Sequence, residues 1–181
     1  MKKRVICAVL TCAAVAAAAA SALWAANTDG IRLRARLTGF QEVPPKLTNA
    51  TGHFTATIDP TRTSVSFVLR YSALSTPVLF SHIHFAQPGV NGGIMVFLCN
   101  NTPTGPQPRP CPSRGGTVSG TFTAQDVIGP GPDNPATDQG ITPGNLRQAI
   151  RAILSGETYV NVHSQRWPGG EIRGKVNVVR R

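Results

Sequence analysis

Alternation of apolar and polar residues with a period of two is the feature that most constrains the fold of this chain. In residues 31–37, every second residue is apolar and arginine fills the positions between them. Successive side chains of an extended strand point to opposite faces, so this pattern is typical of a half-buried strand. Related patterns predict further strands over 54–58, 65–71, 79–85, 93–98, 116–122, 158–163 and 171–179. About eight strands without a βαβ rhythm predict an all-β sandwich or barrel.

Local signals predict one hairpin and one short helix within this all-β domain. The turn Asp59-Pro60-Thr61 separates the strands over 54–58 and 65–71, so these two strands are expected to pair antiparallel. Apolar residues recur at helical spacing from Leu146 to Leu154, with Thr142 expected as the capping hydroxyl and Gly156 as the stop. We expect this helix to lie over an open end or face of the sheet.

The first 26 residues have the pattern of a secretory signal peptide. A basic start is followed by an Ala-rich apolar run and small residues, with cleavage expected after Ala22 or Ala26. An uncleaved membrane anchor is the alternative. Residues 27–181 would then form one secreted or periplasmic domain, with no membrane span after cleavage. Loss of Lys2, Lys3 and Arg4 would lower the net charge from +10 to +7. The remaining basic residues are scattered with few aromatics, which disfavours nucleic-acid binding.

Two cysteines remain beyond this leader, at Cys99 and Cys111. They flank a segment rich in Pro, Thr and Asn that offers no apolar core. Exported proteins keep disulfides, because the compartment is oxidising. We therefore predict a disulfide between them, since their spacing matches no zinc pattern.

Three histidines form the candidate site. His82 and His84 are separated by one residue in a predicted strand, so both imidazoles should project from the same face. His163 shares a face of its strand with Asn161. If the two strands are neighbours, three imidazoles converge in a geometry suited to copper or zinc. Asn161 and Glu171 are candidate partners that orient the imidazoles.

A structural hydrogen-bond network is the alternative interpretation of the same residues. In that case the histidines and Asn161 would bond to one another and to the glycine-rich loop 89–93. The separation of the ring nitrogens distinguishes the two, because nitrogens about 3–4 Å apart fit one ion bonded at about 2 Å. The remaining histidine, His53, lies early in another strand and is predicted to be a surface residue.

Several blocks, taken in order, resemble the CHRD domain first described in chordin. They are residues 38–45, 52–58, the His82-Ile83-His84-Phe85 block, residues 119–126, residues 159–164 and residues 168–174, and together they extend from about Ile31 to Val178. The resemblance implies an exported module with a Greek-key β-sandwich related to the immunoglobulin-like class. The block around His82 is also similar to a metal-binding strand of copper–zinc superoxide dismutases, which share that sandwich.

No complete catalytic set accompanies these motifs. The sequence contains no G-x-S-x-G elbow and no phosphate-binding glycine loop that opens a helix. We therefore expect no catalytic residues and a non-enzymatic binding or structural module, whose partner is a protein or an envelope polymer. The alternative is a copper- or zinc-binding protein that uses His82, His84 and His163, with a redox or metal-handling role.

Overall fold

Antiparallel strands form one continuous sheet in the computed structural model, which describes residues 29–131 and 138–179. The strands are β1 (Ile31–Thr38), β2 (Thr51–Ile58), β3 (Val65–Ser72), β4 (Val78–Phe85), β5 (Gly93–Asn100), β6 (Gly116–Phe122), β7 (Thr158–Ser164), β8 (Ile172–Lys175) and β9 (Asn177–Val178). Their order across the sheet is β5-β4-β7-β8-β1-β2-β3-β6, and β9 pairs with β1. The last predicted strand is thus divided into β8 and β9.

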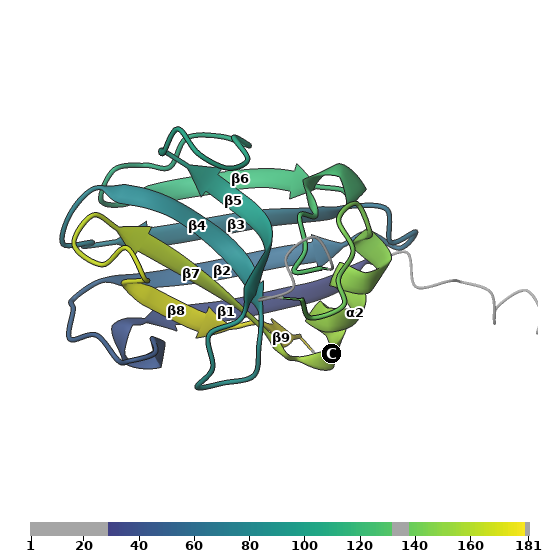
Figure 1. Cartoon of the computed structure of the whole chain (residues 1–181), viewed down its shortest axis with the longest axis horizontal. Helices are drawn as coiled ribbons and strands as arrows, with labels where there is room; N and C mark the ends of the chain where they lie inside the picture. Colours follow the sequence, from purple (N-terminus) through teal and green to yellow (C-terminus); the bar gives the residue numbers. More distant parts are fainter. Residues whose placement is uncertain (1–28, 132–137, 180–181) are drawn as a thin grey trace, which may run out of the picture.

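The sheet folds back on itself into two layers. Strands β5, β4, β7 and β8 cross in front of β1, β2, β3 and β6 in Figure 1. A single bridge between Val96 of β5 and Val127, shortly after β6, brings the two ends of the sheet together. The buried apolar side chains lie between the layers as one cluster. This nearly closed antiparallel arrangement confirms the predicted all-β sandwich or barrel.

The period-two pattern places the predicted residues in this core. In β1 the apolar residues are buried from Leu33 to Leu37 while the intervening arginines are exposed. The predicted hairpin is confirmed, since β2 pairs antiparallel with β3 over its full length. Phe54 and Phe67 from these two strands stack with ring centroids 6.2 Å apart.

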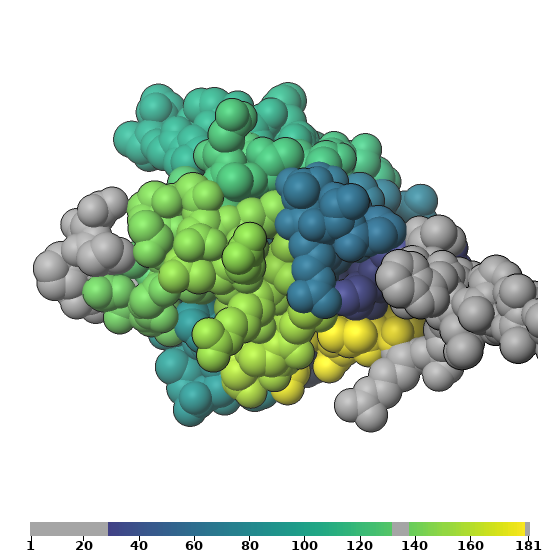
Figure 2. Space-filling view, turned by 90° about the vertical axis from the view of Figure 1, so that its right-hand side faces the viewer, coloured from purple at the N-terminus to yellow at the C-terminus, as the bar shows by residue number. Residues whose placement is uncertain are grey.

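The helix α2 (Leu146–Ser155) covers one end of the sandwich, as predicted (Figures 1 and 2). Its apolar face is buried in the common core. The predicted cap at Thr142 is wrong: the helix begins later, and the Asn145 side chain accepts from the Gln148 amide. Asn145 is the better placed cap because its side chain reaches a free amide of the first turn. Gly156 ends the helix in the left-handed conformation, as expected (φ 78°).

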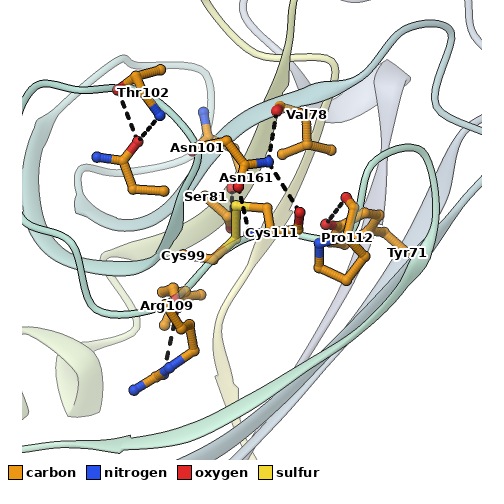
Figure 3. Close-up of a disulfide and its surroundings, with 12 residues drawn as sticks. Tyr71, Val78, Ser81, Cys99, Asn101, Thr102, Arg109, Cys111, Pro112 and Asn161 are labelled. Carbon is orange, nitrogen blue, oxygen red and sulfur yellow. Dashed lines mark hydrogen bonds between the residues drawn. A yellow bond between two sulfur atoms is a disulfide. The ribbon is translucent and has the colours of Figure 1, made fainter.

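The predicted disulfide between Cys99 and Cys111 is present (Figure 3). The two Cα atoms are 5.1 Å apart, and both side chains are buried. Asn101 reinforces the link, since its amide oxygen accepts from the Cys111 N–H and its amide nitrogen donates to the Cys111 carbonyl. The bridge therefore ties the end of β5 to the segment that leads into β6.

Replacement of both cysteines by serine should lower the free energy of unfolding by about 3 kcal/mol, because the unfolded chain gains the entropy of an open loop. Urea unfolding of the oxidised protein and of Cys99→Ser/Cys111→Ser measures the difference. Reduction of the natural protein should reproduce it. A variant that unfolds at the same urea concentration as the natural protein would contradict this prediction.

The predicted signal peptide lies outside the described residues. Within residues 29–131 and 138–179, no helix is long and apolar enough to cross a membrane.

Candidate metal centre

The pairing of β4 with β7 brings the three predicted histidines to one face of the sheet. His82 lies directly opposite Asn161, and His163 is the next residue along β7 on the same face. Ile83 points the other way and is buried in the core between the layers. The three imidazoles therefore lie on the outer face of their layer, although each histidine is at least nine-tenths buried.

The ring nitrogens of the three histidines converge. One nitrogen of each ring lies within 4.8 Å of those of the other two. The ring centroids are 4.9 Å apart for His82 and His163, 5.2 Å for His82 and His84, and 6.2 Å for His84 and His163. Three ligands spaced evenly around an ion at about 2.0 Å would lie about 3.5 Å apart. The cluster thus has room for an ion and would contract slightly around it.

Backbone carbonyl groups orient two of these rings. Nδ1 of His84 donates to the Gly92 carbonyl at 2.9 Å, and Nδ1 of His163 donates to the Pro168 carbonyl at 2.7 Å. A carbonyl oxygen only accepts, so each Nδ1 carries the proton and each Nε2 presents a lone pair. Both Nε2 atoms are buried without a hydrogen-bond partner among the described residues, as are both ring nitrogens of His82. A carbonyl-bound Nδ1 behind a free Nε2 is the usual arrangement of metal-ligating histidines.

Burial keeps the three imidazoles neutral at physiological pH. Burial, followed by repulsion from His163 and His84, lowers the pKa of His82 to about 2. Burial also lowers the pKa of His84 to about 4 and that of His163 to about 3, although their carbonyl bonds act in the opposite direction. A metal binds the neutral form of imidazole, so no proton has to be displaced at neutral pH.

Aromatic rings surround the cluster. Phe80 lies 4.7 Å from His82 and 4.6 Å from His163 between ring centroids, and the Phe97 ring meets His82 edge-on at 4.2 Å. Tyr159 stacks on His84 at 4.7 Å with an interplanar angle of 3°. These rings replace water around the imidazoles, which accounts for the lowered pKa values.

The loop 86–92 between β4 and β5 is fastened to the same face. Arg173 of β8 lies over the Tyr159 ring, 3.3 Å from its centroid, and donates to Asn91 and to the Val90 carbonyl. The Tyr159 hydroxyl accepts from the Gly92 amide at 3.3 Å. Gly92 packs against the Phe85 carbonyl so closely that no side chain fits there. This close approach holds the Gly92 carbonyl beside His84.

The structure places the other predicted residues in different surroundings. Asn161 lies within the cluster face, and its Oδ1 is buried without a hydrogen-bond partner in the described part of the chain. Glu171 is fully buried, but its carboxylate accepts from Thr48 and Ser75 rather than from a histidine. His53 is exposed on β2, as predicted.

Sequence reasoning missed the surroundings of the cluster. Phe80 and Phe97 were predicted only as strand residues, and Arg173 was not connected with the histidines. Strand alternation alone could have placed Phe80 on the same face as His82. Phe97 and Arg173 required the order β5-β4-β7-β8, which decides which strands are neighbours.

A largely apolar pocket of about 420 Å³ adjoins Tyr159, the ring that stacks on His84. Arg173, Lys175 and Glu42 contribute its charged lining, and Phe40 stands exposed beside them. Glu42 is 4 % exposed, and its Oε1 has no hydrogen-bond partner among the described residues. Burial raises the pKa of Glu42 to about 7, against the opposing attraction of Arg173 and Lys46.

Glu42 should therefore make stability depend on pH. From about pH 4.5 to about pH 7 the unfolded chain has released a proton that the folded chain retains, so stability falls as the pH rises. Glu42→Gln removes this dependence. Relative to the natural protein, the variant should gain about 2–3 kcal/mol of unfolding free energy between pH 4 and pH 8. Urea unfolding of both proteins across this range tests it, and a difference that stays constant with pH would contradict it.

Fold and site together define an antiparallel β-sandwich domain with a buried three-histidine cluster on the outer face of one layer. The chain belongs to the CHRD domain family, whose sequence model matches residues 33–176. No curated protein and no solved structure matches the chain. The match begins within β1, spans β2 to β8 and ends just before β9. The resemblance found in the sequence is thereby confirmed.

Proposed function

We propose that this CHRD-domain protein binds one transition-metal ion, copper or zinc, through His82, His84 and His163. The observation that carries the proposal is the set of buried ring nitrogens that face one another without hydrogen-bond partners among residues 29–131 and 138–179. Leaving a buried polar atom unpaired costs about 1–3 kcal/mol. An ion at the centre of the cluster would satisfy one nitrogen of each ring simultaneously.

A network of hydrogen bonds without a metal ion would satisfy fewer of the buried ring nitrogens. The bonds to the Gly92 and Pro168 carbonyl groups belong to such a network. They use Nδ1 of His84 and Nδ1 of His163, and leave Nε2 of both rings without a partner among the described residues. Nε2 of His84 and Nε2 of His163 carry no proton, so they cannot donate to each other, and the single N–H of neutral His82 can donate to only one of them. Asn161 adds an amide oxygen that also has no hydrogen-bond partner in the described part of the chain. The donor set of imidazole nitrogens is one that copper and zinc favour.

We place the protein in an exported compartment, secreted or periplasmic. The disulfide Cys99–Cys111 supports this placement, since cytosolic reductants keep most thiols reduced. The basic and apolar pattern of the first 26 residues supports it as well.

Metal uptake tests the proposal. The purified protein, freed of metal and then loaded with Cu²⁺ or Zn²⁺ and desalted, should retain about one ion per chain by elemental analysis. His82→Ala/His84→Ala should retain none. His53→Ala is the matched control, because this histidine is exposed and far along the sheet from β4. Equal retention by the natural protein and the double variant would refute the proposed site.

A binding module without metal is the second candidate, and the pocket beside Tyr159 is the observation that favours it. Phe40 is 69 % exposed at this pocket, next to the buried charges of Arg173 and Glu42. An exposed aromatic side chain beside a mostly apolar pocket that also contains charged groups is typical of interaction sites. Pull-down from envelope fractions should enrich a protein or polymer partner that Phe40→Ala fails to retain. No enrichment over that variant would count against this candidate.

A further inference from the structure

Among the described residues, no negatively charged side chain belongs to the three-histidine cluster. The residues that converge there offer only neutral imidazoles, and the neighbouring Asn161 offers a neutral amide. The buried carboxylate of Glu171, in the turn before β8, accepts three hydrogen bonds from Thr48 and Ser75. An ion bound here would therefore keep its full charge inside the protein.

A positively charged side chain, which has the wrong sign for a dication, lies beside the cluster. Arg173 is 3 % exposed, and its guanidinium lies over the Tyr159 ring, which in turn stacks on His84. The positive charge of Arg173 is therefore held close to His84. It would repel a metal ion at the same ring, and twice as strongly for a dication as for a monocation.

The surroundings also disfavour a water or hydroxide ligand. Phe80, Phe97 and Tyr159 pack against the three imidazoles, and the loop 86–92 is fastened over the same face. Zinc in a three-histidine site normally completes its coordination with water or another ligand. The free energy needed to bury an ion rises with the square of its charge, so a dication costs about four times as much as a monocation.

Resting on the function proposed above, we infer that the cluster is selective for copper in the cuprous state, Cu⁺. This ion carries a single charge and is satisfied by three nitrogen ligands without water. His82, His84 and His163 supply these three ligands from two paired strands, and aromatic rings pack against all three imidazoles. The protein would accordingly hold Cu⁺ more tightly than either Cu²⁺ or Zn²⁺.

Competition under anaerobic conditions tests the selectivity. The metal-free protein is titrated with Cu⁺ against a chromogenic cuprous chelator, and with Zn²⁺ and Cu²⁺ against chelators of known affinity. Cu⁺ should bind at least about 100-fold more tightly than Zn²⁺, and X-ray absorption of the loaded protein should show three nitrogen ligands. If Zn²⁺ or Cu²⁺ binds as tightly as Cu⁺, the inference fails while the metal site stands. If none of the ions binds, the proposed function itself fails.

Asn161→Asp tests the charge argument directly. The substitution preserves the shape of the side chain and places a carboxylate opposite His82. It should lower the preference for Cu⁺ over Zn²⁺ by at least about tenfold, because the carboxylate stabilises the dication more. An unchanged preference in a folded variant, checked by circular dichroism, would overturn the electrostatic explanation. Should the variant not fold, the competition on the natural protein decides the inference alone.

Discussion

His82→Leu is expected to stabilise the metal-free protein while it abolishes metal binding. His82 is 1 % exposed, and neither of its ring nitrogens has a hydrogen-bond partner among the described residues. Leucine has a similar volume and no polar atoms, so it removes the cost of burying these nitrogens. We expect the free energy of unfolding to rise by about 1–2 kcal/mol. Urea unfolding in the presence of a chelator measures this gain.

Metal should reverse the order of stability of the two proteins. The natural protein gains about 2.7 kcal/mol of unfolding free energy when the free ion is at 100 times its dissociation constant. The leucine variant should gain nothing, and its affinity should be lower by more than about 100-fold. A residue that lowers the stability of the metal-free protein but is needed for metal binding is typical of a functional site.

His53→Leu is the control for this comparison, because His53 is exposed and its substitution should change stability by less than about 0.5 kcal/mol. A structural role for His82 leads to the opposite result. If the imidazole held the fold together through hydrogen bonds, His82→Leu would lower the stability of the metal-free protein. That outcome would contradict the metal-site interpretation even before any ion is added.

Glu171→Ala is expected to cause the largest loss of stability, about 3–4 kcal/mol. The carboxylate is completely buried and accepts from the Thr48 hydroxyl at 2.8 Å, the Ser75 amide at 2.9 Å and the Ser75 hydroxyl at 3.0 Å. Alanine would leave the Ser75 amide unpaired in a cavity. The loops before β2 and before β4 would also lose their common attachment to the turn before β8.

Glu171→Gln separates the charge of this group from its shape. Glutamine retains an oxygen acceptor, so it should restore about half of the stability lost in the alanine variant. Glu157→Ala is a matched control, because Oε2 of its carboxylate has no hydrogen-bond partner within the described residues. Thermal unfolding of the metal-free proteins compares all three. A loss below about 1 kcal/mol for Glu171→Ala would contradict the assigned role.

The strands, the hairpin and the helix were largely predictable because they follow from local periodicity. Alternation in residues 31–37 and helical spacing from Leu146 to Leu154 record which face of each element is buried. The cap was less predictable, since Thr142 and Asn145 are both good capping residues. Which of them caps α2 depends on where the preceding segment meets the core.

The site was predictable only in part. His82 and His84 share a face by strand geometry alone, whereas their approach to His163 depends on the pairing of β4 with β7. Glu171 was expected beside the histidines, and the structure instead joins it to Thr48 and Ser75. The carbonyl groups of Gly92 and Pro168 that orient the rings could not be predicted, because every residue has a backbone carbonyl group.

By itself the sequence determined which residues face inward on each strand, because the side-chain period of an extended chain is a local property. It also supplied the cysteine pair and the imidazoles. Only the tertiary structure decided which strands are neighbours, and therefore that Phe97, His82, Asn161 and Arg173 lie in one row across the sheet. The physical reason is that burial, hydrogen-bond pairing and charge at this site arise between segments about 80 residues apart.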